Sequence, residues 1–110
     1  MWVLKDYCFA VCGNGFFRVT SAFVVTQVTG NVTGSGQVSM DDNGSQIFLA
    51  CNPDGYIYDY DVQTLTQITD PDFLGAVTVG YLAGSFIYNV PDSQVVQYTA
   101  IADGTDIDAL

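Results

Sequence analysis

Carboxylates are the side chains of this chain best suited to chemistry, because the sequence has twelve Asp but neither Glu nor His. Asp59 and Asp61 are two residues apart and would share one face of a strand, about 7 Å from each other. Paired carboxylates hydrolyse glycosidic bonds when a pocket raises the pKa of one of them. These two alternate with Tyr, which favours a surface that faces solvent or a neighbouring chain. An Asp-dependent glycan hydrolase is therefore the least favoured interpretation.

A second acidic group consists of Asp103, Asp106 and Asp108. Their oxygens have a spacing that a calcium ion could use, but the acidic residue that closes the usual calcium loop is absent. We favour ordinary turn capping over metal binding. The sequence also lacks any Ser–His or Cys–His pair. We therefore predict a protein that is not an enzyme, with no catalytic residue, no cofactor and no metal site.

The cysteines Cys8, Cys12 and Cys51 are odd in number and lack CxxC spacing. Cys8 and Cys12 are four residues apart in one expected strand, which separates them by roughly 13 Å, too far for a disulfide. Nothing here indicates a disulfide framework. We predict three unpaired and mostly buried thiols.

The chain carries a net charge of −10, with one Lys and one Arg. Binding to nucleic acid or to an anionic membrane depends on cations, so we expect neither. The longest apolar run, Tyr7–Cys12, is far shorter than the roughly 20 residues of a membrane helix. No signal peptide is recognisable, so we expect a soluble protein or part of one. The acidity suits a basic protein partner.

Four short strands joined by tight turns are expected between Gly36 and Asp72. Asp41–Gly44 and Asn52–Gly55 are turn clusters in which Gly supplies positive φ, and Pro71 ends the unit. The expected strands are Val38–Met40, Gln46–Cys51, Tyr56–Asp61 and Thr64–Thr69.

The flanking segments repeat this unit. Phe48 aligns with Phe9 and Phe86, and Cys51 aligns with Cys12. Hairpin turns are expected at Asn14-Gly15, Pro53–Gly55 and Pro91–Ser93, at similar intervals along the chain. A period near ~40 with four strands per unit is typical of β-propeller blades. The flanking strands are expected at Trp2–Leu4, Tyr7–Cys12, Phe16–Thr20, Ala22–Val28, Ala76–Val79, Ser85–Val90 and Gln94–Ile101.

The sequence therefore predicts an all-β, propeller-like chain of about three four-stranded antiparallel blades. Residues 1–35 form the first blade with a Gly-rich link, 36–74 the second, and 75–110 a third, incomplete blade. Its fourth strand is missing or comes from Thr105–Leu110. Closed propellers have about 4–8 blades, so one chain is not expected to close the ring.

The second strands are apolar on both faces, as in Gln46–Cys51 and Tyr7–Cys12. Such strands must lie between two layers, which a row of blades provides. The outer faces of the first and last blades would then expose apolar side chains. We therefore expect the chain to self-associate as a homo-oligomer.

Four motifs carry a family resemblance: VSMDDNGSQ at 38–46, DGYIYD at 54–59, LTQITDPDF at 65–73 and DGTDIDAL at 103–110. With them the chain resembles the packaged-DNA stabilisation proteins of short-tailed bacteriophages, also called tail accessory or hub proteins. The similarity covers nearly the whole chain and is looser before Val38. Family members are several hundred residues long, so we expect a segment of such a protein or a truncated prophage remnant.

This resemblance implies a structural component of a phage tail hub that closes the portal channel and retains packaged DNA. Its implied partners are other virion proteins, namely the portal and adaptor ring and the tail needle. Its implied location is the virion tail, and the cytoplasm of the bacterial host during assembly. The alternative is a generic propeller-like module that binds a protein or a glycan.

Overall fold

The computed structural model describes residues 2–32, 37–100 and 103–108. They form twelve strands in three four-stranded antiparallel sheets, and this part of the chain contains no helix. The expected all-β class is confirmed. Consequently, none of the described segments is a helix that could span a membrane.

Each sheet joins four consecutive strands in chain order, so every sheet is a meander of hairpins. This confirms the four-stranded antiparallel units. The first sheet contains β1 (Trp2–Leu4), β2 (Tyr7–Cys12), β3 (Gly15–Val19) and β4 (Val25–Asn31). The second contains β5 (Ser39–Asp42), β6 (Gln46–Ala50), β7 (Gly55–Asp59) and β8 (Thr64–Gln67). The third contains β9 (Val79–Leu82), β10 (Ser85–Asn89), β11 (Val96–Ala100) and β12 (Asp103–Asp108).

The third sheet has its fourth strand, β12, which pairs with β11 through a register shift between Thr99 and Ala100. The expectation that this unit lacks a strand is therefore wrong, and the alternative, a strand drawn from the Thr105–Leu110 segment, is nearer to the structure. The three sheets fall within residues 1–35, 36–74 and 75–110, and we propose these ranges as the blade boundaries. Residues 33–36 of the Gly-rich link lie outside the described part of the chain.

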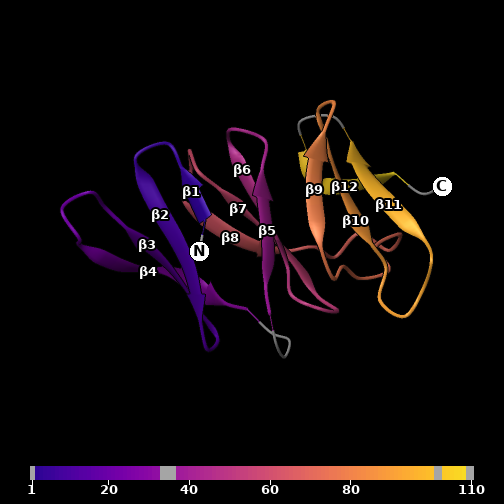
Figure 1. Ribbon diagram of the computed structural model, residues 1–110, viewed down its shortest axis with the longest axis horizontal. Coiled ribbons are helices and arrows are strands. Elements are labelled where there is room, and N and C mark those ends of the chain that lie inside the picture. Colours follow the sequence, from indigo (N-terminus) through magenta and orange to yellow (C-terminus); the bar gives the residue numbers. More distant parts are fainter. Residues whose placement is uncertain (1, 33–36, 101–102, 109–110) are drawn as a thin grey trace.

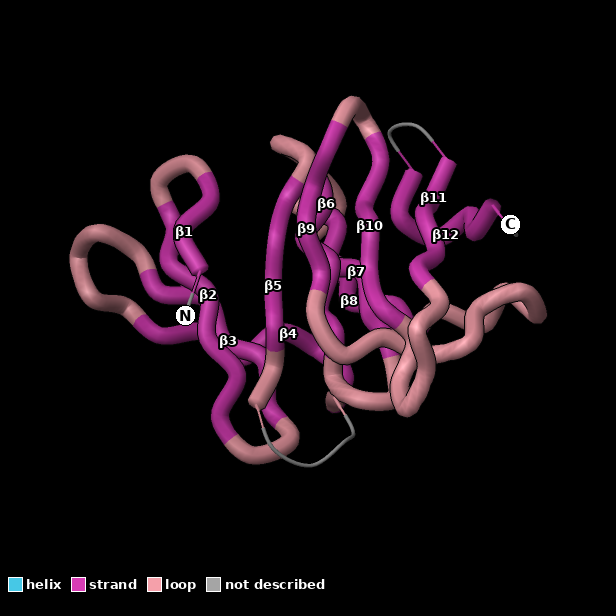
Figure 2. The backbone as a smooth tube through the Cα atoms, turned by 45° about the vertical axis from the view of Figure 1, so that its right-hand side comes forward, coloured by secondary structure: helices cyan, strands magenta, loops and turns pink. Residues whose placement is uncertain are grey.

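The three sheets stand in a row and stack face to face, as Figure 1 shows, without closing into a ring. The first strands of the sheets, β1, β5 and β9, follow one another along one side. The last strands of the first two sheets, β4 and β8, also lie side by side. Figure 2 shows β5 running next to β9. The molecule measures 43 × 28 × 18 Å along its principal axes.

The first apolar core lies between the first and second sheets. Phe9 and Phe16 of the first sheet stack on each other and against Tyr58 of the second, with ring centroids 5.1–5.6 Å apart. All three side chains are buried. Burial of one such side chain stabilises the fold by about 1.5–3 kcal/mol. The other buried members are Leu4, Val28, Val32, Met40, Ile47, Leu49, Cys51 and Tyr56.

A second core lies between the second and third sheets. Phe48 of β6 contacts Phe86 and Tyr88 of β10, with centroid distances of 5.4 and 5.2 Å. The other buried members are Ala50, Ile57, Ile68 and Ala76. Strand β6 therefore buries Ile47 and Leu49 toward the first sheet and Phe48 and Ala50 toward the third. The predicted location of this strand between two layers is confirmed.

The structure shifts the predicted alignment of Phe48 with Phe86 by one residue. Phe9 and Phe48 each face the following sheet, whereas Phe86 faces the preceding one. Because side chains alternate along a strand, the counterpart of Phe48 is the next residue, Ile87, on the other face of β10. Phe48 and Phe86 are thus partners across one interface and not equivalent positions.

Several strand ends differ from the prediction. Strand β4 begins at Val25 and not at Ala22, because residues 20–24 form a turn in which the amide of Phe23 donates to the carbonyl of Thr20 (2.9 Å). Strand β9 begins at Val79, since Ala76 forms backbone hydrogen bonds with Asn52 and Pro53 of the preceding unit (3.0 and 2.9 Å).

The three predicted hairpin turns lie close to their expected positions. The first turn is Gly13-Asn14, one residue earlier than expected, because Gly13 adopts a φ of 61° and Gly15 already pairs with Cys12. The other two connect β6 to β7 across 51–54 and β10 to β11 across 90–95, and their closing backbone hydrogen bonds are 2.8 and 3.0 Å long.

Candidate functional site

Asp59 and Asp61 belong to different elements of the structure. Strand β7 ends at Asp59, so Asp61 lies in the following turn, and the expected shared strand face is wrong. The Oδ1 atom of Asp59 accepts hydrogen bonds from the amides of Asp61 (2.9 Å) and Val62 (3.3 Å). Asp59 therefore caps the β7–β8 turn, a common role for Asp in turns.

The acidic segment 103–108 forms strand β12, and its side chains lie outside what the structure describes. The calcium interpretation of Asp103, Asp106 and Asp108 therefore stays a prediction without a test. Elsewhere in the described chain, no three His, Cys, Asp or Glu side chains gather as a metal site requires.

The three thiols are unpaired but differ in exposure. Cys51 is buried, Cys8 is half-buried and Cys12 is exposed, so the expected burial is wrong for Cys12. Cys8 and Cys12 lie on the face of the first sheet opposite Phe9, and no second layer covers that face among the described residues. Burial and the nearby Asp54 raise the pKa of the Cys51 thiol to about 11.

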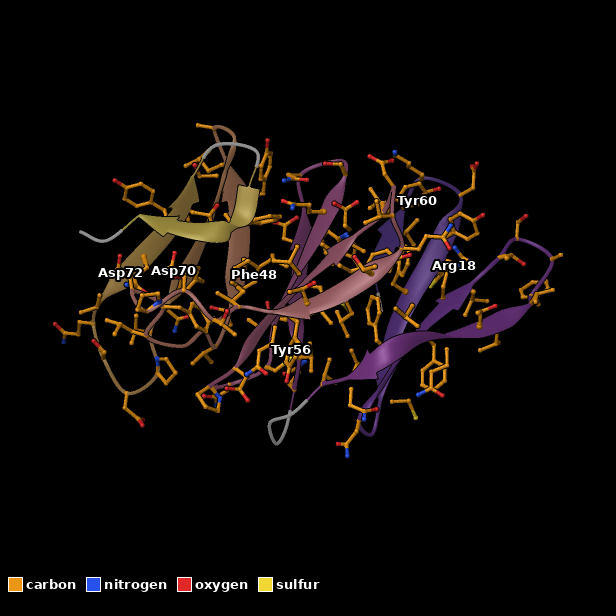
Figure 3. All side chains as sticks on the ribbon, turned by 180° about the vertical axis from the view of Figure 1, so that it is seen from behind. Arg18, Phe48, Tyr56, Tyr60, Asp70 and Asp72 are labelled. Carbon is orange, nitrogen blue, oxygen red and sulfur yellow. The ribbon has the colours of Figure 1, made fainter. Side chains whose placement is uncertain are left out.

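Both cations of the chain contact tyrosine rings around the interface between the first and second sheets. The Nζ atom of Lys5 lies 4.3 Å from the ring centre of Tyr60, and the Arg18 guanidinium lies 4.8 Å from that of Tyr7. Burial raises the pKa of Tyr58, while the charge of Arg18 opposes this rise. Figure 3 shows Arg18 and Tyr60 at the same end of these two sheets. Sequence reasoning missed this cluster, because its members come from three separate hairpins.

A buried glutamine holds the link between the second and third sheets. Gln97 of β11 donates from Nε2 to the carbonyl of Asp72 (2.8 Å). Its Oε1 accepts from the amide of Leu74 (3.1 Å) and from the hydroxyl of Tyr88 (3.0 Å). Burial raises the pKa of Tyr88, which therefore stays protonated and able to donate. We call these three hydrogen bonds the Gln97 clamp, and its role is structural. The two backbone partners lie in the link before the third sheet, far from Gln97 in the sequence, so no local sequence pattern predicts the clamp.

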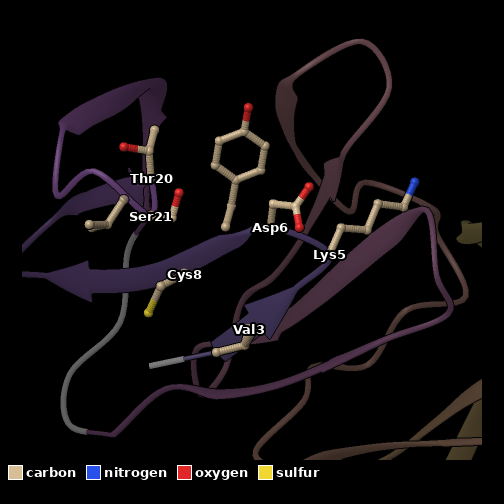
Figure 4. A pocket seen from close by; sticks show the side chains of 8 residues that line it. Val3, Lys5, Asp6, Cys8, Thr20 and Ser21 are labelled. Carbon is tan, nitrogen blue, oxygen red and sulfur yellow. The ribbon is translucent and has the colours of Figure 1, made fainter.

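An open hollow of about 400 Å³ lies on the first sheet. Val3, Cys8 and Val19 line it from three strands of the first sheet, as Figure 4 shows in part. The remaining lining residues are Lys5, Asp6, Tyr7, Thr20 and Ser21. Lys5 and Asp6 are its only charged lining residues, and its floor consists of the apolar side chains of Val3 and Val19 with the Cys8 thiol.

Two sheet faces are apolar and uncovered within the described residues. On the first sheet, strand pairing places Val3, Cys8, Val19 and Val25 in one row across all four strands, with Ala10 and Phe17 beside it. We call this set the first face. On the third sheet, Leu82, Ile87, Val96 and Tyr98 share the side turned away from the second sheet, and we call them the third face.

Three four-stranded antiparallel sheets, stacked face to face with their first strands in succession, define a chain of β-propeller blades. The chain belongs to the protein family described as bacteriophage P22 Gp10, β-propeller, whose model matches residues 1–110. The comparison with curated proteins found no match.

Membership of this family gives the chain a structural role in a bacteriophage. It also implies a place in the virion and interactions with other virion proteins. The resemblance noted from the motifs is thereby confirmed at the level of the family.

Proposed function

We propose that this chain supplies blades to a phage tail hub that closes the portal channel and retains packaged DNA. The observation that carries the proposal is the match of the phage β-propeller family over residues 1–110. The proposed partners are the portal and adaptor ring and the tail needle. The proposed location is the virion tail, with assembly in the cytoplasm of the host.

The charge distribution supports a role in which the protein retains packaged DNA by blocking the channel and not by binding the DNA. Both cations lie in residues 1–35, and residues 36–110 contain eleven Asp without a cation. DNA phosphates would be repelled by such a surface, since nucleic-acid binding depends on Lys and Arg. The proposed role therefore needs contact with proteins of the channel and no contact with DNA, and it needs no enzymatic activity.

The test is complementation of a phage whose corresponding gene is deleted. Filled heads assembled with the chain are expected to keep their DNA protected from nuclease, whereas heads assembled without it lose the DNA. A pulldown on purified portal and adaptor proteins tests the contact directly. Binding to neither protein, together with binding on a glycan array or to an unrelated protein, would favour the alternative recognition module and refute the hub.

A further inference from the structure

A small hollow lies between the first and second sheets, near the edge where β4 and β8 lie side by side. It is partly open and measures about 150 Å³. Both of its walls belong to four-stranded sheets of this chain, so the hollow does not depend on what precedes or follows residues 1–110. The described residues that line it are Arg18, Thr26, Gln27, Val28, Tyr58 and Gln63.

Strand pairing turns polar side chains from the two sheets toward each other. Arg18 of β3 is paired with Thr26 of β4, and both share the face of the first sheet that carries Phe16 and is turned toward the second sheet. Tyr58 of β7 is paired with Ile47 and shares the face of the second sheet that is turned toward the first. The hollow therefore brings a guanidinium group, an aliphatic hydroxyl and a phenol together.

The positive charge in this hollow is available to a ligand. The Arg18 guanidinium lies 4.8 Å from the ring centre of Tyr7, a contact that does not use up its five N–H donors. No carboxylate is among the described residues that line the hollow. Tyr58 is only 1 % exposed, and burial raises the pKa of its hydroxyl, so this group stays protonated and able to donate. The hollow thus offers N–H and O–H donors beside a positive charge.

Size and charge favour a carboxylate over other ligands. The planar guanidinium matches the paired oxygens of a carboxylate or a phosphate. A single cation lines the hollow and balances a single negative charge, whereas a phosphate dianion would add excess charge close to Asp6 and Asp61, which act on the neighbouring Tyr60. A volume of 150 Å³ holds roughly five water molecules, which is about the size of propionate.

We propose that this hollow binds a carboxylate group, with the Arg18 guanidinium and the Tyr58 hydroxyl as its donors. Small free acids carry this group, and so do the Asp and Glu side chains of another protein. In a chain with a net charge of −10, the hollow is a place where an acidic group finds a cation. The inference rests on the contacts of these residues and not on the proposed hub function.

Two unique NMR signals make the test possible. The chain contains one Arg and one Trp, so the Nε–H signal of Arg18 and the indole N–H signal of Trp2 are each single. Trp2 donates to Asp42 (2.7 Å) outside the hollow and is the internal control. Sodium propionate is compared with sodium chloride at about pH 6, where carboxylates are ionised. We expect propionate alone to shift the Arg18 signal saturably, with a dissociation constant on the order of 10 mM.

Three variants locate the binding groups. Tyr58→Phe keeps the buried ring but removes the hydroxyl, and it is expected to weaken propionate binding at least ~10-fold, because a hydrogen bond to a charged group is lost. Tyr60→Phe is the matched control, since Tyr60 lies beside the cations but does not line the hollow. Lys5→Gln removes the other cation of the chain. Both controls should bind propionate as the wild type does, and thermal unfolding checks that every variant is folded.

A peptide with one Glu among neutral residues distinguishes the two sources of the carboxylate. Tighter binding of the peptide than of propionate assigns the hollow to a protein side chain, and weaker binding assigns it to a small free acid; both results support the site.

An Arg18 signal that responds equally to chloride, or that never saturates, would overturn the proposal. So would a Tyr58→Phe variant that binds propionate as tightly as Tyr60→Phe does. A stronger response to sulfate than to propionate would overturn the choice of a carboxylate. No phage protein takes part in the titration, so its failure leaves the hub function standing.

Discussion

Cys51 makes stability depend on pH. Its folded pKa of about 11 lies above the ordinary value of 9.0, so the unfolded chain loses this proton first as the pH rises. The stabilising contribution is complete below pH 9 and is lost between pH 9 and 11. We expect the free energy of unfolding to fall there by less than about 1.4 kcal/mol per pH unit. Urea unfolding of wild type and Cys51→Ala measures it, and the variant should show a shallower fall; equal slopes would contradict this.

Thiol labelling should distinguish the three cysteines. Cys12 is exposed and is expected to react with an aromatic disulfide reagent at least ~100-fold faster than buried Cys51, since only an accessible thiolate reacts. Cys12→Ser should remove the fast phase, and Cys51→Ala should leave it unchanged. Fast labelling of all three thiols in the folded protein would contradict the burial of Cys51.

Phe23 occupies a strained turn position. Its φ is 63° and its side chain is 85 % exposed, so it combines an unfavourable backbone conformation with little burial. Phe23→Asn is expected to stabilise the protein by about 0.5–1 kcal/mol, because Asn adopts this conformation more readily. Val24→Asn, at the neighbouring exposed position without positive φ, is the control. A higher melting temperature for both variants, or for neither, would refute the strain argument.

Gln97 is expected to be the most costly polar side chain to replace in the link between the second and third sheets. Gln97→Leu leaves the carbonyl of Asp72, the amide of Leu74 and the hydroxyl of Tyr88 without this partner. We expect a loss of about 3 kcal/mol in urea unfolding. Tyr88→Phe removes only one of the three hydrogen bonds and should cost about 1 kcal/mol. An equal or smaller cost for Gln97→Leu would show that the clamp adds nothing.

At the scale of elements, the sequence predicted which segments form strands more accurately than it predicted where each strand begins and ends. Gln46–Cys51 reads as apolar on both faces, and the structure buries both. Tyr7–Cys12 has the same pattern, yet among the described residues only the side with Phe9 is covered. Alternation of apolar residues shows that a strand face is apolar, and it does not show which element packs against that face. Strand β4 begins at Val25, later than the predicted Ala22, because a turn closed by Thr20 precedes it. This turn contains neither Gly nor Pro, so nothing in the sequence indicated it.

The alignment of Phe48 with Phe86 shows a second limit of the sequence. A shift of one residue moves a side chain to the opposite face of a strand, so matching Phe48 with Phe86 or with Ile87 has opposite consequences for packing. For the candidate site, composition shows only that carboxylates are the abundant ionisable groups and that histidine is absent. The cation–tyrosine cluster and the Gln97 clamp were not predictable from the sequence, because each joins residues from distant hairpins.

At the scale of the whole molecule, the excess of carboxylates should make the protein more stable in salt. The chain contains twelve Asp but only two cationic side chains, and both of these contact tyrosine rings. Raising the NaCl concentration from roughly 20 to roughly 500 mM screens the repulsion, and we expect the melting temperature to rise by a few degrees. Asp61→Asn with Asp92→Asn, both at turn positions, should reduce this rise. A melting temperature that falls with salt would mean that the cation contacts outweigh the repulsion.

The order of the strands also has a consequence for how the protein is made. Every strand pairs with its immediate neighbour in the chain, so each sheet needs only the closure of short loops. Contacts between residues close in sequence form quickly, whereas distant ones are slow. During synthesis, each blade can be completed as soon as its fourth strand leaves the ribosome, and face-to-face stacking is the only later step. A chain assembled in this way keeps apolar faces exposed for the shortest time, which limits aggregation before its partners arrive.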